Sequence, residues 1–210
     1  MVTILRRSFW PLLALCAALA ALILIAMPAE KTLGPVIKLV YLHGALSRGG
    51  MLGLIAAGGV GLAYLIRPRP ALARWTAGLT LSGWGFWGLH FIVSMPATRL
   101  TWGPWIAWGE PRVTMTLQVI VVGLVVLVVS RLVDSARFTA AANLLLGAAV
   151  ALLVGRTGVL RHPLDPIGAS PSATLQLIYL ALLIPMIVAM LLVAWRLAQN
   201  VPGASEGPGT

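Results

Sequence analysis

The chain has 210 residues, of which 60% are hydrophobic and 10% charged, and its mean hydropathy is +0.97. This composition excludes a soluble domain built around one core and is typical of a polytopic membrane protein. The formal net charge of +10 does not indicate a nucleic-acid-binding protein, because the basic residues are spread between apolar segments and form no continuous basic face. Membrane lipid is the simpler partner for these charges.

Six segments are long and apolar enough to cross a membrane, which takes ~20 residues. In chain order they cover residues 9–27, 39–66, 75–96, 113–130, 138–155 and 173–195. The first resembles a signal peptide, but its length and the lack of a small-x-small cleavage site favour a retained helix. We therefore predict an all-α fold: a single domain over residues 1–200 that forms a six-transmembrane-helix bundle, with a disordered tail over 201–210.

The basic residues also predict an orientation. Eight of them fall at the ends of the spans that share a side with the N-terminus, and six fall on the other side, which also carries Glu30, Glu110 and Asp165. Cytoplasmic loops are enriched in Lys and Arg. We therefore expect a plasma or inner membrane protein with both termini in the cytoplasm.

Three features fall on the external side because spans alternate in direction. The loop after the third span contains Trp102, Trp105 and Trp108, whose spacing predicts an amphipathic surface helix. His162 lies in the loop after the fifth span. His43 lies ~36 Å along the second span from Arg67, at the outer edge of a ~30 Å hydrocarbon layer.

This combination favours a haem site. Two neutral imidazoles can ligate haem iron from opposite faces. Haem is also a flat apolar plate with a carboxylate edge, so it requires aromatic surface and nearby cations. We therefore expect His43 and His162 to meet above the tryptophan loop.

The segment "WGPWIAWGEPRVTM" resembles the tryptophan-rich signature W-G-x-W-W-x-W-D-x-R-x-T of the cytochrome c assembly family, which contains haem-handling membrane proteins of CcmC, CcmF and CcsA type. The six spans and the segments "KLVYLHGALS" and "LRHPLDP" are most similar to CcmC. Ile106 replaces the second tryptophan of the motif, and Gly109–Glu110 replaces its aspartate.

The resemblance implies roles for individual residues. His43 and His162 would be the axial ligands of a non-covalent b-type haem. The three tryptophans would form its platform, with Glu110 at the position of the motif's acid and Arg112 at that of its arginine. The partners implied are haem and a haem chaperone or other cytochrome c maturation proteins.

Each feature also has a simpler interpretation. Interfacial tryptophans commonly anchor a loop to the membrane. Arg48 could meet a haem propionate or reach the nearby interface. His90, inside the third span, is expected to hydrogen-bond to a neighbouring helix rather than to bind a second haem. The stripe of small residues Gly49, Gly53, Ala57 and Gly61 predicts close helix packing inside the bundle.

We therefore expect a binding protein that presents or relays haem at the outer face for cytochrome c maturation. No nucleophile–base pair or phosphate-binding loop indicates an enzyme. Two alternatives stay open: a membrane-anchored haem protein that exchanges electrons with quinone, and a structural or transport subunit without haem.

Overall fold

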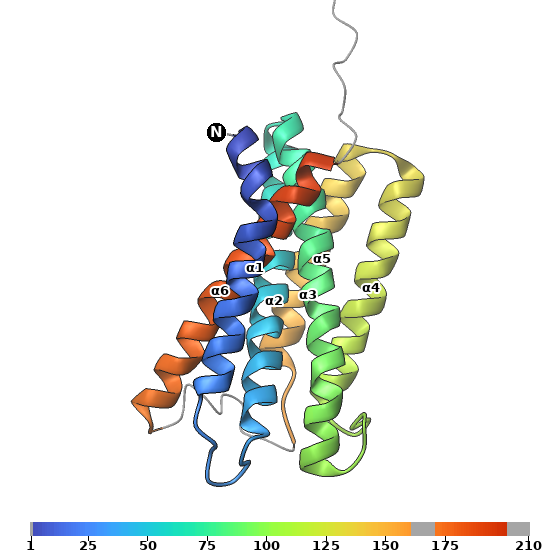
Figure 1. Ribbon diagram of the computed structural model, residues 1–210. Coiled ribbons are helices and arrows are strands. Elements are labelled where there is room, and N and C mark those ends of the chain that lie inside the picture. Colours follow the sequence, from blue (N-terminus) through green and yellow to red (C-terminus); the bar gives the residue numbers. More distant parts are fainter. Residues whose placement is uncertain (1, 161–170, 201–210) are drawn as a thin grey trace, which may run out of the picture.

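The protein is an all-helical bundle, shown in Figure 1 as a computed structural model in which residues 2–160 and 171–200 are described. The predicted tail at 201–210 and His162 lie outside the described residues. Six helices are present in the described part: α1 (Val2–Ala26), α2 (Ile37–Ile66), α3 (Pro70–Trp102), α4 (Pro111–Val133), α5 (Ala136–Arg156) and α6 (Ala173–Asn200). The all-α prediction is confirmed.

Five of these helices are long and apolar enough to cross a membrane, namely α1 from Arg7 onward, α2, α4, α5 and α6. These helices make the chain a multi-pass membrane protein. Helix α3 has 33 residues but is not among the five, so the third predicted span is the one that length and composition do not establish. The reason is visible in its sequence, which contains Trp, Thr, Ser and His where the other helices contain Leu, Ile and Val.

Helix α2 is the centre of the bundle and packs against α3, α5 and α6. The predicted stripe of small residues makes this packing possible. A Cβ atom added at Gly53 would lie 2.8 Å from the Gly83 Cα of α3, and one added at Gly61 would lie 2.6 Å from the Ala140 carbonyl oxygen of α5. Because these distances are below van der Waals contact, only glycine allows the three backbones to approach this closely. The stripe is internal packing, as predicted.

The polar side chains of α3 bond to the neighbouring helices. The Ser82 hydroxyl donates to the Met190 carbonyl of α6 at 2.7 Å, and the Trp84 indole donates to the Ile120 carbonyl of α4 at 2.9 Å. The Thr80 hydroxyl bonds to the Asn143 side chain of α5, and both residues are buried. Buried polar groups are costly unless they are hydrogen-bonded. These bonds explain how a less apolar helix fits at the interior of the bundle.

The helices alternate in direction, so the α1–α2 and α3–α4 connections lie together at the lower end in Figure 1. The segment between α3 and α4 is not the predicted amphipathic helix: residues 103–110 form bends and a turn. Gly103 ends α3 with a φ of +95°, and Pro104 and Pro111 restrict the residues before them to non-helical conformations. Too few residues remain between these breaks for a stable helix.

Candidate functional site

A cavity of about 650 Å³ opens at this lower end of the bundle. This volume falls within the ~300–1,000 Å³ that is usual for small-molecule and cofactor sites. The inner wall includes apolar side chains, among them Trp87, Phe91 and Met115, and the rim carries charged side chains from three segments. The charged residues are Glu30, Arg48, Glu110 and Arg112. The cavity therefore fits a ligand that has an apolar body and a charged edge.

Two histidines line the cavity side by side. The ring centroids of His43 (α2) and His90 (α3) lie 5.4 Å apart, and the planes are inclined by 29°. The Nδ1 atom of His43 is 3.2 Å from the Leu39 carbonyl oxygen, and the Nδ1 atom of His90 is 2.9 Å from the His43 carbonyl oxygen. A carbonyl oxygen can only accept, so each Nδ1 is the donor. In the neutral ring the lone pair is then on Nε2, which is the arrangement of metal-binding histidines.

The His90 hydrogen bond also excludes one geometry. It holds α3 directly against the α2 backbone at the level of His43, and Trp87 packs beside His90 with centroids 5.6 Å apart. A planar cofactor could pass between the two histidine rings only if this bond were broken. His90 therefore joins α3 to the α2 backbone at His43.

The four charges of the rim, two carboxylates and two guanidinium groups, sum to zero, and they interact with one another. The charges of Arg48 and Glu110 both act on the Arg112 guanidinium, the first by repulsion and the second by attraction. The Nε atom of Arg112 is buried and has no hydrogen-bond partner among the described residues. A buried donor without a partner is unfavourable by ~1–3 kcal/mol. An acidic group on a ligand would satisfy it.

Glu110 has a structural role as well. Its side chain is only 1% exposed, and both carboxylate oxygens accept from the Leu160 backbone N–H at 3.3 Å. This contact connects the tryptophan loop to the segment that follows α5. Glu110 therefore places a carboxylate at the cavity wall.

On the opposite side of the rim, Glu30 stabilises the α1–α2 connection. Its carboxylate accepts from the backbone N–H groups of Leu33 and Thr32, each at 2.7 Å. These two bonds hold the pKa of Glu30 below its ordinary value. Glu30 at the mouth of the cavity is therefore ionised at neutral pH.

The three loop tryptophans do not share one environment. Trp102, the last residue of α3, lines the cavity, whereas Trp105 and Trp108 do not and are 56% and 68% exposed. Trp102 is thus placed to contact a ligand. Trp105 and Trp108 fit the alternative interpretation, in which they anchor the loop to the membrane interface.

The predicted residues are brought together in part. His43, Arg48, Trp102, Glu110 and Arg112 line one cavity, which agrees with the expectation that they share a face of the membrane. His162 lies outside the described residues, so its distance from His43 stays a prediction. His90 was expected only to bond to a neighbouring helix. It does so, and its place in the cavity wall could have been anticipated from its position in the half of α3 nearer the α3–α4 loop, in the helix that follows α2 in the sequence.

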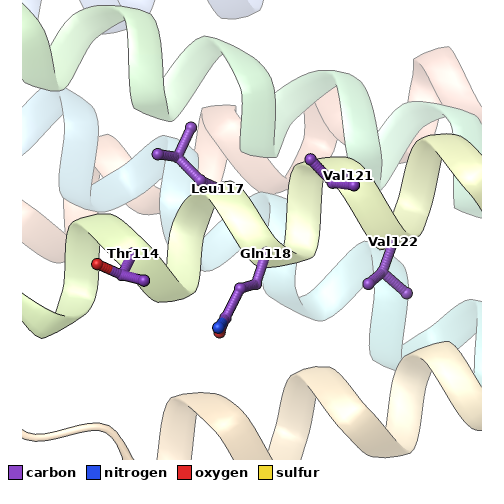
Figure 2. Close-up of a pocket in the computed structure, with 5 residues that line it drawn as sticks. All are labelled: Thr114, Leu117, Gln118, Val121 and Val122. Atoms are coloured by element: carbon purple, nitrogen blue, oxygen red, sulfur yellow. The ribbon is translucent and has the colours of Figure 1, made fainter.

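A second, smaller hollow lies on α4 alone, lined by Thr114, Leu117, Gln118, Val121 and Val122 (Figure 2). These side chains are mostly exposed and apolar, and no other helix supplies a facing wall. It is a shallow depression on the outer surface of a membrane helix and not a second site.

These features define a helical membrane protein with a cofactor-sized cavity at one end. The chain matches no family model, and a search of curated proteins found no similar sequence.

Proposed function

We propose that this protein binds haem in the cavity and presents it to a partner protein during cytochrome c maturation. The observation that supports this function is the cavity itself, which combines His43, Trp102 and Arg112 around an apolar interior. These are the residues that the resemblance to CcmC-type proteins assigns to haem. In this proposal the chain is a binding protein and not an enzyme.

The residues fit the chemistry of haem. His43 would supply an axial nitrogen through Nε2, and Arg112, whose buried Nε has no partner among the described residues, would meet a propionate. Trp102 and Phe91 offer aromatic surface to the macrocycle. No three His, Cys, Asp or Glu side chains of the described residues gather to hold a metal ion, but a porphyrin brings four of the iron's ligands itself. His162 is proposed as the second axial ligand.

The proposal also includes the topology. We take α3 as the sixth span because it packs against α2, α4, α5 and α6 within the bundle and its polar groups bond to them. The cavity would then face the external side of the plasma or inner membrane, with both termini in the cytoplasm. The excess of basic residues on the N-terminal side supports this orientation.

The visible spectrum of protein purified in mild detergent tests haem binding. We expect a Soret band in the wild type that is lost in His43→Ala and reduced or shifted in His162→Ala. Trp102→Ala should lower haem content, whereas the matched variants Trp105→Ala and Trp108→Ala should not, because these side chains lie outside the cavity. An unchanged spectrum in His43→Ala would contradict the proposal.

A haem-transfer assay distinguishes a protein that relays haem from one that keeps its haem for electron transfer. Haem that is presented for delivery should pass to an added apoprotein, such as apomyoglobin, within minutes. A haem that stays bound through this challenge and is reduced by quinol would support the electron-transfer alternative instead.

A further inference from the structure

The hydrogen bond within α2 is a weak constraint on the His43 ring. Its Nδ1 donates to the Leu39 carbonyl oxygen, one turn earlier in the helix, at 3.2 Å, which is at the long end of the range for such bonds. In an α-helix this carbonyl also accepts from the His43 backbone N–H, so the ring shares its acceptor. The ring is half-buried and lines the cavity. Its orientation therefore depends on contacts from other helices.

The His90 ring of α3 supplies such a contact. The two imidazole centroids lie 5.4 Å apart and the planes are inclined by only 29°, which is the range of stacked aromatic pairs. If the His43 ring turned about its χ2 angle, one of its edges would approach the face of His90. The stacked arrangement therefore restricts this rotation.

His90 is itself fixed on two sides. Its Nδ1 donates to the His43 carbonyl oxygen at 2.9 Å, and the Trp87 ring packs beside it with centroids 5.6 Å apart. Trp87 is only 1% exposed, and its indole donates to the Thr116 carbonyl of α4 at 3.2 Å. A continuous series of contacts thus runs from α4 through α3 to the His43 ring on α2.

We propose that His90 is a positioning residue whose ring face holds the His43 imidazole with Nε2 directed into the cavity. With Nδ1 turned to the Leu39 carbonyl, Nε2 is the ring nitrogen on the side away from the α2 backbone. A ligating side chain has to be held within ~10–20° of its productive geometry by the residues packed around it. The consequence rests on the proposed haem function: His90 determines how firmly His43 holds the iron.

Nitrogen NMR of the apoprotein tests the orientation without haem. The chain has three histidines, so labelling histidine with nitrogen-15 reports on three rings, and His43→Ala identifies the signals of His43. We expect a single Nδ1–H tautomer at His43 in the wild type. His90→Asn keeps a donor for the His43 carbonyl but removes the ring face, and should give averaged tautomer signals at His43. His90→Phe keeps a ring face and should preserve the single tautomer.

Transfer of haem to apomyoglobin tests the consequence. Residues that orient a metal-binding histidine commonly change metal affinity by ~10–100-fold, and such changes appear mostly in the dissociation rate. We expect transfer about tenfold faster in His90→Asn and unchanged in His90→Phe. If His90→Asn does not fold, His90→Leu replaces it, because leucine also lacks a flat face. Trp84→Phe is the matched control: it removes a similar bond from α3 to α4 and should change neither the tautomer nor the transfer rate.

Three results would overturn this inference and leave the haem proposal intact. These are a single His43 tautomer in His90→Asn, averaged signals in His90→Phe, and an equal acceleration of transfer in His90→Asn and Trp84→Phe, which would indicate a general loss of packing. A wild type that binds no haem would contradict the proposed function instead. The NMR comparison would still decide the role of His90.

Discussion

The contact between α2 and α3 at Gly50 gives the most direct test of the fold. A Cβ atom added at Gly50 would lie 2.7 Å from the Trp87 backbone nitrogen and 3.0 Å from the Gly83 carbonyl oxygen. Ordinary van der Waals contact begins at ~3.5 Å, so Gly50→Ala requires the helices to separate by up to about 0.8 Å. Both neighbours are backbone atoms, which cannot rotate away. We expect the substitution to destabilise the protein by about 1–3 kcal/mol, the usual effect of overpacking.

Gly59→Ala is the matched control on the same helix. Its Cβ atom would meet nothing within 4 Å, and alanine is the better helix former by ~1 kcal/mol in an exposed helix. Unfolding in mixed micelles of increasing denaturing-detergent fraction, followed by tryptophan fluorescence, measures both variants. Equal stability of Gly50→Ala, Gly59→Ala and the wild type would refute the close approach of α2 and α3.

Three further predictions concern polar contacts. Asn143→Ala should destabilise the bundle by ~0.6–1.7 kcal/mol in the same unfolding assay, because it removes the bond to Thr80 between membrane helices. Glu110→Ala should increase hydrogen exchange at the Leu160 amide, whose acceptor it removes; unchanged exchange would show that the carboxylate does not hold this segment. Glu30→Gln should lower the melting temperature at neutral pH, and the difference from the wild type should disappear as the pH falls. The pKa of Glu30 is lowered by folding, so its contribution is present above the unfolded value of ~4.3 and is lost as the pH falls through the folded value.

The apolar pattern of the sequence predicted most of the helices well. The fourth helix was expected at 113–130 and is observed at Pro111–Val133, and the fifth was expected at 138–155 and is observed at Ala136–Arg156. Membrane helices have a strong signal because lipid leaves no other way to satisfy the backbone. The ends of the helices were predicted less well. The apolar run in the sequence shows which residues lie in the hydrocarbon layer, but a helix can continue beyond that layer by a turn.

The arrangement of the site was harder to predict. The spacing of Trp102, Trp105 and Trp108 predicted that they share one face of a helix. However, Gly103 and Pro104 end the helix there, and only Trp102 reaches the cavity. The ring contact between His43 and His90 depends on the separation of two helices. That separation is determined by glycine contacts such as Gly50 against Trp87, which no pattern within a single helix reveals.

The structure of α3 has a consequence for how the protein is made. Only residues 67–69 separate α2 from α3, and the hydroxyl, indole and imidazole groups of α3 find their acceptors on other helices. Alone in the lipid bilayer, such a helix would expose these polar groups to acyl chains. Because they would then have no hydrogen-bond partners, the helix would return to the aqueous phase. In the six-span topology proposed above, we therefore expect α3 to leave the translocon together with α2 as a hairpin, and the later helices to complete its insertion.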